Sequence, residues 1–138
     1  MYPTYDPGGC ITQLPGVSWK PASLVGPELI AGSTRLKSGT AQKVVLNAIS
    51  TITMVRLGKT YRNLMVDLRP TSAKLRNRAA RIVGLITGAD ERAVLEALRA
   101  VDGDTKAAIV MIRRGLPPAA ARALLQECQG SLRAALGE

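Results

Sequence analysis

One segment of the chain combines hydroxyl groups, glycines and cations in a pattern that can bind a phosphate. It begins at Gly26 and continues as Gly-Pro-Glu-Leu-Ile-Ala-Gly-Ser-Thr-Arg-Leu-Lys-Ser-Gly-Thr-Ala-Gln-Lys. Backbone N–H groups at the start of a helix attract anions, and the helix dipole adds to this attraction. Arg35 can hold a phosphate through two N–H groups, and Lys37 can act as a point charge. Ser33 and Thr34 can add hydroxyl donors, so these four residues are the predicted phosphate ligands.

The same segment contains Glu28, the candidate for a catalytic acid or base or for a ligand of a sugar hydroxyl. A simpler interpretation is that Ser33 or Thr34 caps the following helix and that the cations are solvated. The order of residues differs from the Gly-x4-Gly-Lys-Ser/Thr order of a P-loop. The residues alone leave both interpretations open.

The composition excludes several classes of catalytic site. The chain has 138 residues and no histidine, which rules out a Ser-His-Asp triad, a Cys-His pair and the usual histidine-based metal sites. Its two cysteines, Cys10 and Cys128, lie at opposite ends of the sequence and have no metal-ligand spacing. We therefore expect no metal and no cofactor.

The positive charge is concentrated in the middle of the sequence. The net charge is +9, and residues 31–88 contain eleven Lys and Arg but one acidic residue, Asp67. Such an excess favours an anionic partner. A basic helical domain that binds nucleic acid is a less favoured alternative, because aromatic residues for base stacking are scarce. No apolar run reaches the length of a membrane span, and the first residues do not resemble a secretory signal, so we expect no membrane partner.

Apolar spacing and capping residues predict a mainly α-helical chain. Prolines and glycines are dense in residues 1–27 and favour an irregular arm, which we place over residues 1–24. A helix roughly 30 Å long is expected from about Leu36 to Arg56. A connector is expected over Thr60–Pro70, and further helices are expected between recognisable caps and stops. Thr71 or Ser72 can cap the next helix, which Gly88 ends, and Asp90, Asp104 and Ser131 cap helices over residues 91–101, 105–114 and 132–136. Pro117 and Pro118 open a helix that extends to about Gln129. The last ones are expected to form a small bundle with few polar groups that converge.

Several stretches together resemble the N-acetylmuramic acid 6-phosphate etherases, relatives of the glucokinase regulatory proteins. The segment from Gly26 to Lys43 is similar to the signature of that family. The likeness continues downstream in collinear matches, which are Thr53–Lys59, Asn63–Asp67, Lys74–Ala79, Asp102–Ile109 and Gly130–Ala135. It covers about residues 25–138, with Arg62 where the family usually has Gly and Ser72 where it usually has Asn.

The resemblance implies a fold and an activity. It implies the C-terminal helical part of a sugar isomerase-type (SIS) α/β domain over residues 25–88 and a ubiquitin-associated-like three-helix module over residues 89–138. Family members are cytoplasmic dimers without a metal that recycle cell-wall sugars. They cleave the lactyl ether of N-acetylmuramic acid 6-phosphate to N-acetylglucosamine 6-phosphate and D-lactate, with carboxylates as acid and base. Ser33, Thr34 and Arg35 match the loop that faces the sugar phosphate, with Glu28 and Lys37 at its flanks.

The chain also departs from the family pattern. Members are roughly twice as long, and their N-terminal half carries most of the sheet and the catalytic glutamates. Residues 1–24 do not resemble that half. We therefore expect a truncated form that is inactive alone and that needs a second copy or a separate N-terminal half to cover the 36–57 helix. A non-catalytic module that binds or senses a sugar phosphate is the alternative.

Overall fold

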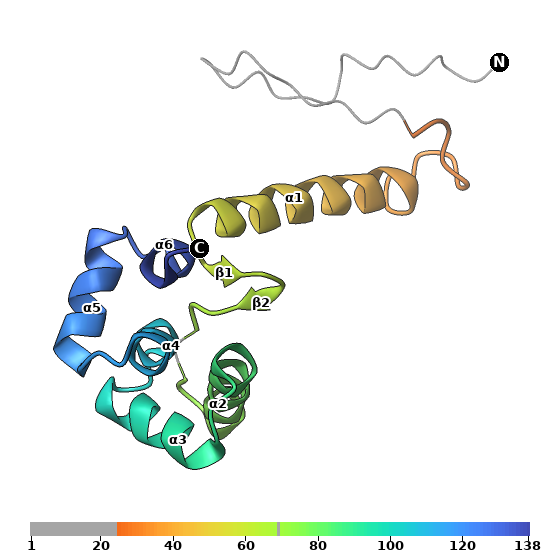
Figure 1. Ribbon diagram of the computed structural model, residues 1–138. Coiled ribbons are helices and arrows are strands. Elements are labelled where there is room, and N and C mark those ends of the chain that lie inside the picture. The colour runs from red at the N-terminus through yellow and green to blue at the C-terminus, as the bar shows by residue number, and fades with distance from the viewer. Residues whose placement is uncertain (1–24, 69) are drawn as a thin grey trace. The chain divides into compact units, whose positions relative to one another are not determined.

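The structure is a computed structural model that describes residues 25–68 and 70–138. The predicted arm over residues 1–24, including Cys10, lies outside the described residues. The chain divides into two compact units, the first ending at Leu46 and the second covering Asn47–Glu138. The described part is mainly helical, with six helices and one short hairpin (Figure 1).

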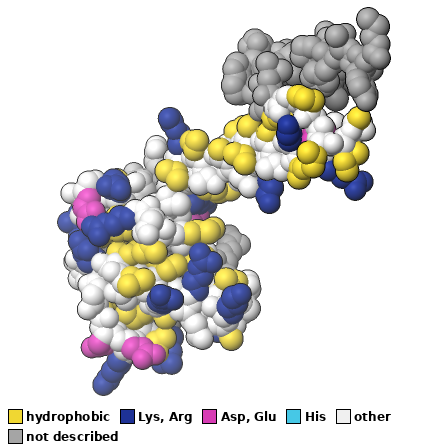
Figure 2. All heavy atoms as spheres, turned by 90° about the vertical axis from the view of Figure 1, so that its right-hand side faces the viewer, with side chains coloured by type: hydrophobic (Ala, Val, Ile, Leu, Met, Phe, Trp, Pro, Cys, Tyr) yellow, Lys and Arg dark blue, Asp and Glu magenta, His cyan; other side chains and the backbone are white. Residues whose placement is uncertain are grey.

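The first helix, α1 (Lys37–Arg56), begins within one residue of the predicted start and ends at the predicted Arg56. None of its residues is buried. Large apolar side chains instead remain exposed along its length (Figure 2), and they are Val44, Leu46, Ile49, Ile52, Met54 and Val55. The expectation that this helix would present an uncovered apolar surface is thus confirmed.

A two-stranded antiparallel hairpin follows α1, where the sequence indicated only a connector. Its strands are β1 (Thr60–Tyr61) and β2 (Leu64–Met65), with Tyr61 opposite Leu64. Arg62 begins the two-residue loop and has a φ of 54°. This is the left-handed region, which glycine, the residue that the family usually has here, adopts without strain.

The remaining helices build one hydrophobic core. They are α2 (Ala73–Thr87), α3 (Glu91–Ala100), α4 (Thr105–Arg114), α5 (Pro118–Glu127) and α6 (Leu132–Leu136). α4 lies at the centre and packs against the other four. Its residues from Thr105 to Val110 are buried, as expected for a helix surrounded by others. α2 belongs to this core, although the division proposed at residue 88 assigns it to a different segment from α3–α6.

Local capping explains where these helices begin. The side chains of Ser72, Asp90, Asp104 and Ser131 each accept a hydrogen bond from the backbone N–H three residues later. These four caps are confirmed. A chain with no Phe, one Trp and three Tyr is predicted to have an aliphatic core, and the core is aliphatic apart from the buried ring of Tyr61. The apolar spacing of residues 91–101 predicts that Val94, Leu95, Leu98 and Val101 point inward. Three of them are buried, but Leu95 is 37% exposed, and Ala97 is buried as well.

Candidate functional site

The predicted phosphate loop leads directly into α1. A turn in which the Ser33 N–H donates to the Ile30 carbonyl at 3.0 Å reverses the chain. Gly32 in this turn has a φ of 83°, a conformation that glycine adopts without strain. The turn places the side chains of Thr34 and Arg35 on the exposed surface just before the helix, with Ser33 half-buried.

Glu28 caps the helix across this loop. Its carboxylate accepts hydrogen bonds from the backbone N–H groups of Lys37 and Ser38, each at 3.0 Å. These bonds to Ser38 and Lys37 stabilise the charged form and hold the pKa of Glu28 below its usual value. Glu28 is therefore a weak proton acceptor in this arrangement. Neither Ser33 nor Thr34 provides a side-chain cap among the described residues.

The Glu28 cap also reduces the number of backbone N–H groups at the start of α1 that an anion can bind. Two of the N–H groups that the sequence offered to a phosphate are occupied by Glu28, and the N–H of Gly39 donates to the Thr34 carbonyl at 2.8 Å. The Lys37 ammonium donates to the Pro27 carbonyl at 2.8 Å. Side chains rather than helix N–H groups are thus the available donors, and the structure brings the four predicted ligands together only as neighbours along one exposed loop.

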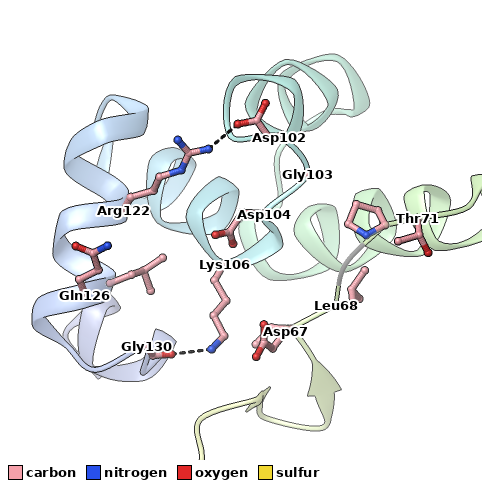
Figure 3. Close-up of a pocket in the computed structure, with 13 residues that line it drawn as sticks. Asp67, Leu68, Thr71, Asp102, Gly103, Asp104, Lys106, Arg122, Gln126 and Gly130 are labelled. Carbon is pink, nitrogen blue, oxygen red and sulfur yellow. Dashed lines mark hydrogen bonds and ion pairs between the residues drawn. The ribbon is translucent and has the colours of Figure 1, made fainter.

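A second candidate site, missed by the sequence analysis, is a cleft of about 690 Å³ in the unit Asn47–Glu138. Lys106 projects into it and donates to the Gly130 carbonyl at 2.8 Å (Figure 3). Arg122 pairs with Asp102 at 2.9 Å on the rim, and Asp67 is ion-paired with Lys59. Burial holds the pKa of the Lys106 amine below its usual value.

The polar groups of this cleft largely satisfy one another. Asp104 caps α4 by accepting from the Ala107 N–H, and the other charged groups have the partners given above. A Cβ at Gly103 would meet the Pro70 ring at 2.6 Å, so the segment before α2 packs closely against the turn between α3 and α4. The polar groups that gather in this cleft therefore hold the elements together, and the prediction that few polar groups of the helical bundle could converge on a ligand stays a prediction.

Other predicted features lie elsewhere. Four basic side chains of α2 are exposed, and they are Lys74, Arg76, Arg78 and Arg81. Within residues 25–68 and 70–138, no group of three or more Asp, Glu or Cys residues is placed to hold a metal ion. No helix in these same ranges has both the length and the hydropathy to cross a membrane.

Comparison with known proteins identifies relatives of this chain. No protein-family model matches it. A protein of Streptomyces avermitilis is 59% identical over 113 residues, which are 82% of this chain and 36% of the relative. A protein of Rubrobacter xylanophilus is 60% identical over 115 residues, which are 83% of this chain and 38% of the relative. A protein of an Enterobacter species is 53% identical over 131 residues, which are 95% of this chain and 43% of the relative.

These relatives are all named N-acetylmuramic acid 6-phosphate etherase. An alignment over 131 of the 138 residues also includes part of residues 1–24, so for this relative the similarity continues into the arm that we expected to be unrelated. The chain spans about two fifths of the length of the relatives it matches. By this similarity, it belongs to the N-acetylmuramic acid 6-phosphate etherase family and corresponds to the C-terminal portion of its members.

Proposed function

We propose that this chain is the part of an N-acetylmuramic acid 6-phosphate etherase that holds the sugar phosphate. The observation that carries the proposal is the 53–60% identity to etherases over most of the chain. The exposed loop with two hydroxyl groups, a guanidinium and an ammonium before α1 supports it, because such donors suit a phosphate dianion. The whole reaction cleaves the lactyl ether to N-acetylglucosamine 6-phosphate and D-lactate by elimination of lactate followed by addition of water.

Within this proposal each loop residue has a distinct role. Arg35 binds two phosphate oxygens, and Ser33 and Thr34 donate their hydroxyl hydrogens. Lys37 adds positive charge while its ammonium remains tethered to the Pro27 carbonyl. Glu28 positions the loop on α1 rather than moving a proton, because its carboxylate is bound to two backbone N–H groups. The catalytic acid and base then come from the part of the enzyme that this chain lacks.

The fold assignments follow from the same proposal. α1 and α2 correspond to the C-terminal helices of a SIS-type domain, and the shorter helices from α3 onward correspond to a ubiquitin-associated-like module. The exposed apolar side chains of α1 are then covered by the N-terminal half or by a second copy in a homodimer. We place the protein in the cytoplasm, in the recycling of cell-wall sugars.

A second candidate function is a non-catalytic module that binds a sugar phosphate. Two observations favour it for the isolated chain. The chain spans about two fifths of its relatives, and the one carboxylate beside the predicted loop is occupied as a helix cap. Under this alternative the loop binds in the same way, but the chain performs no ether cleavage.

Calorimetric titration of the chain with N-acetylglucosamine 6-phosphate tests the phosphate loop, which both candidates share. We expect saturable binding that Arg35→Ala weakens by about tenfold or more, since a bidentate charged contact is lost. Arg92→Ala is the matched control, because Arg92 lies on α3 and pairs with Glu96 at the surface. Unchanged binding by Arg35→Ala would remove the loop from the site. Binding of unphosphorylated N-acetylglucosamine with equal affinity would remove the phosphate from recognition.

A further inference from the structure

A groove lined by three arginines lies in the unit Asn47–Glu138, apart from the phosphate loop. It has a volume of about 470 Å³. Its walls are the C-terminal end of α1, the hairpin and the segment that joins α5 to α6. Arg56, Arg62 and Arg133 line it, and we call it the arginine groove.

The charge of the arginine groove is unbalanced. Its lining contains three cations and no Asp or Glu. Among the residues that the structure describes, none of these arginines forms an ion pair. The cleft around Lys106 differs, because Asp67 and Arg122 in its lining each form an ion pair. Unpaired guanidinium groups gathered in a concave site attract a multiply charged anion.

A buried aromatic ring orders two of the arginines. The guanidinium carbons of Arg62 and Arg133 lie 5.4 and 5.9 Å from the centre of the Tyr61 ring. Tyr61 is 2% exposed, and its hydroxyl donates to Glu138 at 2.7 Å. Cation–π contact of this kind holds a guanidinium in place. Less conformational entropy is then lost when the arginines bind a ligand.

Glu138 is an acidic group that interacts with Arg62 and Arg133 through their charges, and it is already engaged. Besides the Tyr61 hydroxyl, its carboxylate accepts from Arg113 at 3.5 Å. The bond from Tyr61, together with the charges of Arg62, Arg113 and Arg133, keeps its pKa below the usual value. Glu138 therefore stays ionised at neutral pH and offsets part of the local charge, but it leaves the groove net positive.

The backbone conformation of Arg62 also supports a binding site here. Its φ of 54° is uncommon for a residue with a side chain. Such strain is often found where a side chain has to be held at a site. The guanidinium of Arg62 lies over the Tyr61 ring, and the residue lines the groove.

The rest of the lining indicates the type of ligand. Thr60, Gln129 and Ser131 offer polar donors, while Val55, Leu57 and Leu132 are apolar. The volume falls in the range of small-molecule sites. A single-stranded nucleic acid would need open aromatic faces, but the one aromatic ring here is buried beneath two guanidinium groups.

We infer that the arginine groove binds a small phosphorylated molecule at a site separate from the loop before α1. The inference does not rest on the proposed function. It requires only the residues of the unit Asn47–Glu138, so it holds or fails whatever the Arg35 loop binds.

The test is a titration of the isotopically labelled full chain with pyrophosphate, followed by nuclear magnetic resonance. We expect saturable shifts of the Gln129 and Ser131 amide signals and of the Arg62 side-chain Nε–H signal. Arg133→Ala should weaken binding about tenfold or more, since one charged contact is lost. Arg35→Ala and Arg92→Ala should leave these shifts unchanged. Arg133 is exposed, and Arg133→Gln serves as a second variant if the spectrum of the alanine variant shows a disturbed fold.

Three results would overturn the inference. The first is an absence of saturable shifts up to about 10 mM pyrophosphate, which is weaker than a specific site would be. The second is equal binding by the Arg133 variants and the unchanged chain. The third is binding that Arg35→Ala alone abolishes, which would place the probe at the loop before α1.

Discussion

Arg62 has a left-handed backbone conformation that costs an L-residue about 1 kcal/mol or more. Its side chain also packs on the Tyr61 ring. Comparing Arg62→Gly with Arg62→Ala separates these effects, since both variants lose the guanidinium and only glycine relieves the strain. We expect Arg62→Gly to be more stable than Arg62→Ala by about 1 kcal/mol, measured by urea unfolding. Equal stabilities would show that the φ of this residue costs nothing.

The buried hydroxyl of Thr105 lowers the stability of the core for a different reason. It is 1% exposed, and its hydroxyl oxygen has no hydrogen-bond partner among the described residues. An unsatisfied buried hydroxyl costs about 1–3 kcal/mol, and valine fills nearly the same volume. Thr105→Val is therefore expected to raise the free energy of unfolding by about 1 kcal/mol. A fall in stability on this substitution would mean that the hydroxyl has a partner, such as a buried water.

For a whole element, the start of α1 depends on the charge of Glu28. The pKa of Glu28 is lowered in the folded chain, so its capping is fully present above the usual carboxyl pKa and is lost as the pH falls through the lowered value. The Cα chemical shifts of Lys37 and Ser38 should therefore lose helical character only when the pH falls below the usual glutamate pKa of 4.5. Glu28→Gln should show a frayed helix start with no such pH dependence. Identical pH profiles for both proteins would remove Glu28 as the cap.

The helices were predictable because their limits are encoded locally. Asp104 and Gly115 lie at the two ends of α4, and one cap and one stop suffice to bound it. The hairpin was not predictable in this way, since each of its strands has two residues. Too few residues alternate to give a strand period.

The candidate sites were likewise predictable only where their residues are close in sequence. The loop around Arg35 could be found because its residues are consecutive, but its cap could not, because the Glu28 carboxylate meets α1 nine and ten residues later. The arginine groove joins Arg62 to Arg133, and Tyr61 reaches Glu138 across 77 residues of sequence. Only the folded core brings such groups together.

The whole molecule carries an apolar helix that its own core does not cover. Ile49 and Ile52 on α1 are 49% and 57% exposed. Water-exposed apolar surface of this kind favours association, so we expect the isolated chain to form dimers or larger species in sedimentation velocity. Replacing both isoleucines with glutamate should yield a monomer and change the free energy of unfolding by less than about 0.5 kcal/mol. A chain that is already monomeric at high concentration would contradict this expectation.

The most direct test of the account is an assay of D-lactate release from N-acetylmuramic acid 6-phosphate. The chain is assayed alone and mixed with the N-terminal portion of the Streptomyces avermitilis relative, of which it spans 36%. If the chain supplies the phosphate loop while the acid and base lie in the other portion, the chain alone releases no lactate. The mixture then releases lactate at a rate that Arg35→Ala lowers by about tenfold or more. Release by the chain alone, or an Arg35→Ala mixture as fast as the unchanged one, would contradict the account.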